Sequence, residues 1–171
     1  MTKEKKCPAK QMAAHADRVR LFQILCALDG GGEDLQPSEL ALRLETLFTE
    51  DPSTDVEGAQ NAAPGKNIVA ELDALSRSCA EACEIWNRRE EIDALIAPNM
   101  TGWTIDRLTV VDRAVIRLAV YECLIAHSVN VQIALSEAVL LAREFGRDES
   151  SRFVNGVLAR VVRAAEDHGT P

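Results

Sequence analysis

The sequence predicts an all-α protein in which two small helical bundles pack together. Three helical patterns of similar length follow one another between residues 108 and 165, separated by short breaks. The composition agrees, because 47% hydrophobic residues with only 4% aromatic residues suit an aliphatic helical protein better than a β-sandwich. At 171 residues the chain is long enough to bury a core. We expect six or seven helices in one domain over 13–171, with sub-bundles at about 13–97 and 103–167.

The beginning of the chain predicts a flexible basic arm over 1–12, followed by a helix over 13–28. Residues 1–20 hold six lysines and arginines against two acids, although the whole chain carries a net charge of −8. Apolar residues then recur at helical spacing, and the glycines at 30–32 end the pattern. The basic start is typical of either a solubilising tail or a local nucleic-acid contact.

Two further helical patterns occupy the middle of the chain. One begins at Pro37 and runs through Phe48, and it is followed by a long break at 50–66 that contains proline and glycine. The other runs over 67–97, where the polar residues at 87–91 are expected to interrupt the helix. In the next break, we expect the aromatic ring of residue 103 to pack as an anchor between the two bundles.

Each helix in the last third of the chain carries its own start or stop signal. Thr109 with Asp112 predicts a capped helix start, Asn130 predicts the next one, and Gly146 ends that second helix. Gly156 lies inside the third helix, where glycine costs roughly 1 kcal/mol relative to alanine. We therefore expect a close helix contact at Gly156.

Residues with catalytic or metal-binding patterns are scarce. The three histidines lie in different segments, and the sequence contains no HExxH, Walker, GxSxG or GxGxxG motif. Cys79 and Cys83 lie one helical turn apart and could offer two zinc ligands, but five cysteines without a CxxC pair favour buried thiols. We expect a binding protein with no enzymatic activity, no cofactor and no metal.

The chain also lacks the patterns of membrane insertion and export. No apolar run approaches the roughly 20 residues that span a bilayer. The first ten residues contain lysines without the apolar segment that follows them in a signal peptide. We expect a cytoplasmic protein with no membrane partner.

Four motifs in the last third resemble the C-terminal half of the NusB family of transcription antitermination factors. They are VDRAVIRLAVYE at 111–122, ALSEAV at 134–139, AREFG at 142–146 and SRFVNGVL at 151–158. The resemblance implies the NusB fold, which consists of two helical bundles. It also implies binding of boxA-type single-stranded RNA together with a small-subunit ribosomal protein, NusE, to modify the elongating RNA polymerase.

The resemblance further implies which residues contact these partners. A basic segment at the first helix and a basic-aromatic pair in the last helix match the RNA-binding face, and two acids match positions used for NusE or for the RNA edge. For Phe153 core packing is equally expected, and for both acids a helix-cap role is nearly as well supported. The implied RNA-binding residues are Lys10, His15, Arg18, Arg20, Arg152 and Phe153, and the implied partner-binding residues are Asp112 and Glu149.

The chain departs from the family pattern where aromatic residues are expected. Cys26, Ser78 and Asn99 stand at or near such positions, and the basic segment is less dense than usual. An alternative function is therefore a helical protein-protein adaptor of the same fold with weakened or lost RNA binding. A homodimer, which could bury the RNA-binding surface, is a further alternative that the pattern leaves open.

Overall fold

The computed structural model describes residues 8–31 and 64–167, with side chains from Ala14 to Gly31 and from Ala70 to Asp167. No strand occurs within these ranges, and the all-α prediction is confirmed. The predicted helix from Pro37 to Phe48 lies outside the described residues, as does the predicted break at 50–66 up to residue 63. The α-helices are α1 (Pro8–Gly30), α3 (Pro64–Asn87), α4 (Arg89–Ile96), α5 (Val110–Val120), α6 (Val131–Phe145) and α7 (Ser150–Asp167).

Helix boundaries follow local signals in the sequence, with one extension. α1 begins at Pro8, five residues before the predicted start, and proline is well suited to a first helical position because its missing N–H has no partner there. The predicted arm thus overlaps the first turns of α1. The interruption predicted at 87–91 is confirmed, because α3 and α4 are separated at Arg88, whose φ and ψ are −98° and 10°.

Side-chain caps form where the sequence predicts them. The Thr109 hydroxyl accepts a hydrogen bond from the backbone N–H of Asp112 at 3.1 Å, and the Asn130 side chain accepts one from Gln132 at 2.8 Å. α6 ends at Gly146, as predicted. A Cβ at Gly146 would lie 2.6 Å from the Cβ of Ser150, so only glycine fits at this turn.

The close helix contact expected at Gly156 does not occur. A Cβ built at this position in α7 would have no heavy atom within 4 Å, apart from its own helix backbone and chain neighbours. The prediction is wrong because the face of α7 that packs is the one bearing Val154, Val157 and Leu158, all fully buried.

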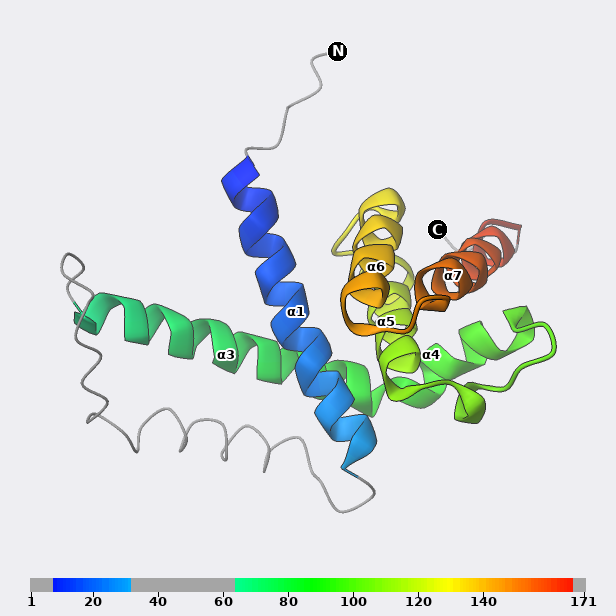
Figure 1. Cartoon of the computed structure of the whole chain (residues 1–171), viewed down its shortest axis with the longest axis horizontal. Coiled ribbons are helices and arrows are strands. Elements are labelled where there is room, and N and C mark those ends of the chain that lie inside the picture. The colour runs from blue at the N-terminus through cyan, green and yellow to red at the C-terminus, as the bar shows by residue number, and fades with distance from the viewer. Residues whose placement is uncertain (1–7, 32–63, 168–171) are drawn as a thin grey trace, which may run out of the picture.

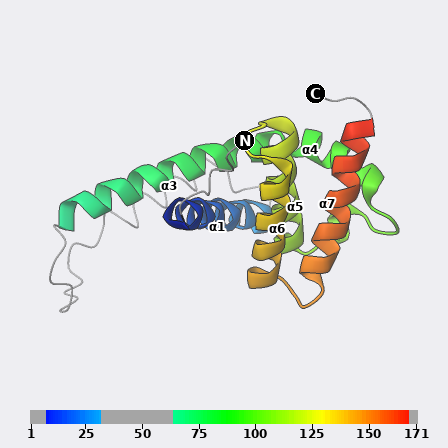
Figure 2. The ribbon, with the colours of Figure 1, turned by 90° about the horizontal axis from the view of Figure 1, so that it is seen from above.

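α5 is the central helix of the molecule. It contacts α1, α4, α6 and α7, and its residues from Ala114 to Val120 are buried without interruption. In Figure 1, α1 crosses α3 on one side, while α4, α6 and α7 gather around α5 on the other. Figure 2 shows α3 extending beyond the rest of the helices. The buried side chains of both halves form one cluster.

The division into sub-bundles at about 13–97 and 103–167 stays a prediction. α4 lies in the first of these ranges, yet it contacts α5 and α7 as well as α3. In the described part of the chain, no helix is both long and apolar enough to cross a membrane.

Three short elements join the long helices. η1 (Ala97–Asn99) and η2 (Ile105–Arg107) are 3₁₀ turns between α4 and α5, and η3 (Tyr121–Ile125) is a turn of π-helix that continues α5. Trp103 lies between η1 and η2 and is 55% exposed. The prediction that this residue packs as an anchor between the two bundles is therefore wrong. The half-buried Ile105 and Leu108 pack against the core instead.

Candidate functional site

A pocket lies where the chain enters α5 and α7. We call it the aromatic pocket; its volume is about 290 Å³. Its lining comes from the segment before α5, from the first turn of α5 and from the start of α7. The lining residues are Trp103, Arg107, Leu108, Thr109, Asp112, Arg147, Glu149, Ser150 and Phe153.

Local backbone features position these side chains. Gly102 has a φ of 75°, a conformation that glycine adopts readily, and it turns the chain just before Trp103. At the other wall, the Ser150 hydroxyl accepts a hydrogen bond from the backbone N–H of Arg147 at 2.9 Å. This bond holds the segment between α6 and α7 against the first turn of α7, which carries Phe153.

Two aromatic rings face one another at the pocket. Trp103 and Phe153 have ring centroids 6.4 Å apart and planes inclined at 65°, an edge-to-face arrangement that aromatic pairs favour. Phe153 is half-buried and packs against the core, whereas Trp103 is largely exposed. Phe153 therefore packs against the core and also lines the pocket.

Arginines surround the rings. Arg107 and Arg147 are exposed, and neither forms an ion pair with another described residue. Arg152 lies next to the pocket and pairs with Glu149 at 3.2 Å, but both side chains are strongly exposed, at 86% and 79%. Such an exposed pair is weak, so the Arg152 guanidinium remains accessible to another partner.

Asp112 combines a structural role with a lining position. Its Oδ2 accepts a hydrogen bond from the Thr109 hydroxyl at 2.9 Å, which completes the helix cap. Its other oxygen, Oδ1, is buried and has no hydrogen-bond partner among the described residues. Buried acceptors are nearly always satisfied, so this enclosed oxygen is an exception within the described ranges.

The residues predicted on α1 lie at other places. His15 lies between two carboxylates of α6, with Nδ1 2.7 Å from Glu137 and Nε2 3.5 Å from Glu144. The hydrogen bond to Glu137 raises the pKa of His15, although burial opposes the rise. Arg20 pairs with Asp17 on its own helix at 2.9 Å.

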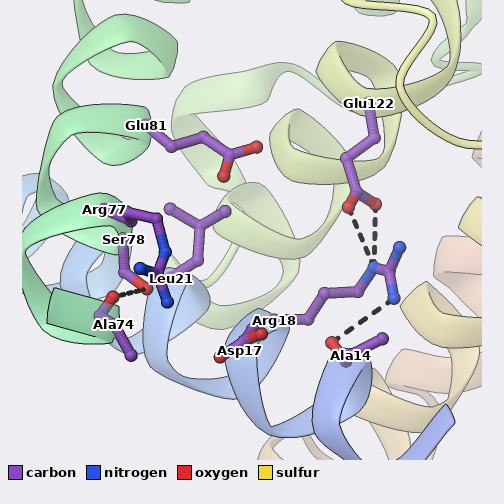
Figure 3. A pocket seen from close by; sticks show the side chains of 9 residues that line it. All are labelled: Ala14, Asp17, Arg18, Leu21, Ala74, Arg77, Ser78, Glu81 and Glu122. Atoms are coloured by element: carbon purple, nitrogen blue, oxygen red, sulfur yellow. Dashed lines mark hydrogen bonds and ion pairs between the residues drawn. The ribbon is translucent and has the colours of Figure 1, made fainter. Parts of the chain in front are cut away.

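Arg18 points into the interior and binds Glu122 of η3. Its Nε lies 2.9 and 3.1 Å from the two carboxylate oxygens, and the side chains are only 11% and 8% exposed. Burial raises the pKa of the Glu122 carboxyl, and the Arg18 guanidinium opposes this rise. Figure 3 shows this pair at a second pocket, of about 250 Å³, between α1, α3 and η3. Arg18 therefore neutralises a buried carboxylate.

The structure thus separates the predicted site residues into two groups. Asp112, Glu149 and Phe153 line one pocket with Arg152 beside it, whereas His15, Arg18 and Arg20 of α1 do not line that pocket. The side chain of Lys10 lies outside the described residues. The RNA and partner contacts of all these residues stay predictions.

Sequence reasoning missed several functional candidates. Trp103, Arg107 and Arg147 lie in the breaks before α5 and α7, where no helical periodicity marks them. One signal for Trp103 was available, because a tryptophan directly after a glycine in a polar break has few core positions to occupy. Glu122 was also missed as the buried partner of Arg18. The available signal was that it is a lone acid on an otherwise apolar helix face.

Burial makes two of the described thiols, Cys26 and Cys123, poor nucleophiles. Burial raises the pKa of Cys26 to about 12 and that of Cys123 to about 11. At neutral pH both stay protonated, and the thiol is much less nucleophilic than the thiolate. Cys79 is buried and Cys83 is half-buried, one helical turn apart on α3.

Together, the helices and the aromatic pocket define a small all-α protein that presents aromatic rings and arginines at one surface. A family model for the NusB family matches residues 15–163. The chain belongs to the NusB family, which confirms the resemblance found in its sequence motifs.

Individual relatives agree with this assignment. A protein of Symbiobacterium thermophilum named transcription antitermination protein NusB is 49% identical over 130 residues, covering 71% of this chain and 85% of the relative. One of the same name from Bacillus licheniformis is 36% identical over 121 residues, covering 69% and 88%. Among solved structures, NusB of T. maritima superimposes with a TM-score of 0.56 and 25% identity, covering 87% and 89%. The family is thus one of transcription antitermination proteins.

Proposed function

We propose that this protein is a transcription antitermination factor that binds boxA-type single-stranded RNA together with NusE and modifies the elongating RNA polymerase. Membership of the NusB family supports the antitermination role. The observation that supports RNA as the ligand is the aromatic pocket, with accessible arginines around two aromatic rings. The proposed role is binding rather than catalysis.

The chemistry of this surface suits an unpaired strand. Single-stranded RNA is bound by cationic side chains that neutralise phosphates and by aromatic rings that stack on splayed bases. Arg152 and Phe153 are adjacent in α7 and supply one group of each kind. Arg107 and Arg147 add positive charge at this face, in a chain whose net charge is −8.

The acids at the same face suit a basic protein partner. Glu149 is strongly exposed at the pocket rim, and we assign it to the contact with NusE. Asp112 is mostly enclosed, so in this proposal it contributes through the shape and charge of the pocket wall.

Arg152→Ala tests the RNA contact. Affinity for fluorescein-labelled boxA RNA should fall, and the slope of log affinity against log salt should decrease by about one unit, because one phosphate contact is lost. The control is Arg163→Ala, which removes an exposed arginine further along the same helix. If the two variants bind RNA with equal affinity, the assignment of Arg152 to the RNA-binding site is wrong.

A specific observation also supports the adaptor alternative. His15, Arg18 and Arg20, the predicted basic contacts on α1, each face carboxylates of this chain. If they are unavailable to RNA, the protein could bind NusE with little RNA contribution. Titration with boxA RNA, with and without NusE, separates the two: the adaptor binds NusE but shows no RNA-dependent change.

Self-association is the remaining part of the proposal. If a homodimer covers the RNA-binding face, RNA affinity should decrease as protein concentration passes through the dimerisation range. Constant affinity across that range, measured beside sedimentation velocity, would reject regulation by dimerisation.

A further inference from the structure

We propose that the aromatic pocket holds one unpaired nucleotide of the bound RNA, and that Trp103 is the residue on which its base stacks. The inference rests on the proposed function and deepens it. It names a recognition residue that the motif resemblance did not supply, and it assigns the pocket a single nucleotide as its ligand.

The exposure of Trp103 is the first argument. A tryptophan ring left 55% exposed forgoes much of the free energy that its burial would contribute. Only two other large hydrophobic side chains in the described ranges are exposed, Leu95 and Leu140, and neither lines this pocket. Trp103 is also held in place, by the turn at Gly102 and by the edge contact with Phe153.

The size of the pocket is the second argument. Its volume of about 290 Å³ lies just below the range of about 300–1,000 Å³ typical of small-molecule sites. A single base with its sugar is a ligand of suitable size and has the flat faces that aromatic rings contact. Stacking of this kind accepts any base, because every base has a π-face.

The polar groups of the pocket are the third argument. Arg107 and Arg147 can neutralise the phosphates that flank the base, because neither pairs with another described residue. A nucleotide supplies the planar ring that Trp103 can stack on and the anion that these arginines can neutralise.

Trp103 fluorescence provides a direct readout. In a Trp86→Phe background, Trp103 is the only tryptophan of the chain. Titration with boxA-type RNA should quench its emission with the same midpoint as the anisotropy of the fluorescein-labelled RNA, because stacking places a base against the indole.

Substitution supplies the second measurement. Trp103→Ala should weaken RNA binding by about 5- to 150-fold, since base stacking on an aromatic ring contributes roughly 1–3 kcal/mol. Trp103→Phe should recover most of the affinity because it keeps an aromatic face. The matched control is Leu140→Ala, at an exposed apolar residue of α6, and it should bind as wild type does. Circular dichroism melts establish that each variant is folded.

The outcomes separate a failure of this inference from a failure of the proposed function on which it rests. RNA binding that is unchanged in Trp103→Ala, without quenching in the single-tryptophan protein, overturns the inference and leaves the proposed function standing. Quenching by NusE but not by RNA identifies the pocket as a protein-docking site and also overturns it. A folded protein that binds no RNA, with or without NusE, rejects both.

Discussion

At the scale of single residues, His15 shows how tertiary contacts determine the role of a side chain. Both of its ring nitrogens face carboxylates, Glu137 and Glu144. A neutral imidazole has only one N–H donor, so the ring can donate to both carboxylates only when it is protonated. In its protonated form, His15 is a cation that joins α1 to α6.

The pH dependence of stability follows from this pairing. Because the folded-state pKa of His15 is raised above 6.5, its contribution is fully present below about pH 6.5 and is lost as pH rises through the folded-state pKa. His15→Asn should therefore lower the free energy of unfolding more at about pH 6 than at about pH 9. Urea denaturation at the two pH values measures the difference.

The control for His15 is His127→Asn. His127 is exposed and forms no ion pair within the described ranges. Its positive φ of 49° is a conformation that asparagine tolerates. Its substitution should cause no comparable pH-dependent loss. An equal pH profile for both variants would contradict the proposed role of the His15 pairs.

Residue roles were only partly predictable from sequence. Motif positions identified Arg152 and Phe153 as neighbours on one helix, and local spacing identified Asp112 as a cap residue. The partners of His15 and Arg18 are 122 and 104 residues away in the sequence. No local pattern encodes such distant pairs, so their ionic interactions became visible only in the folded chain.

At the scale of elements, Gly146 and Gly156 have opposite roles. Gly146 ends α6, where a side chain would overlap the carbonyl oxygen of Ala142 and the side chain of Ser150. Gly156 lies inside α7 with open space beside it. The sequence marks both as unusual but does not tell which one is sterically required.

Alanine substitution of each glycine tests this contrast. Gly146→Ala should lower the free energy of unfolding by roughly 1–3 kcal/mol because the extra methyl group overpacks the turn. Gly156→Ala should raise it by roughly 1 kcal/mol, because alanine favours a helix interior. Chemical denaturation of both variants measures the change in the free energy of unfolding. A lower free energy of unfolding for Gly156→Ala would contradict the open space found beside Gly156.

At the scale of the whole molecule, a cluster of charges joins three helices. Arg117 of α5 donates to Asp93 of α4 at 2.7 and 2.9 Å and to Asp29 of α1 at 2.9 Å. Arg113 also binds Asp29, at 2.7 Å. Because α5 lies at the centre, this cluster fixes α1 and α4 relative to the helices that carry the aromatic pocket.

Arg117→Met tests the cluster. It should lower the free energy of unfolding by roughly 3 kcal/mol, because it leaves the partly buried Asp93 carboxylate without its cation and removes one of the two arginines bound to Asp29. Arg117→Lys should restore little, since an ammonium group cannot reproduce the forked geometry that bridges two carboxylates. Arg152→Met, at an exposed pair, is the control and should leave the urea midpoint unchanged. Equal midpoints for the Arg117 and Arg152 variants would show that the cluster does not stabilise the fold.

The sequence by itself determined the helices of the last third, their caps, their apolar faces and the family motifs. These features depend on contacts within a few residues, which spacing and residue type encode directly. Only the tertiary structure decided that His15, Arg18 and Arg20 face acids, that Trp103 remains exposed, and that the breaks before α5 and α7 line the aromatic pocket. Those outcomes depend on which distant surfaces meet when α5 is buried, and that is a property of packing rather than of local sequence.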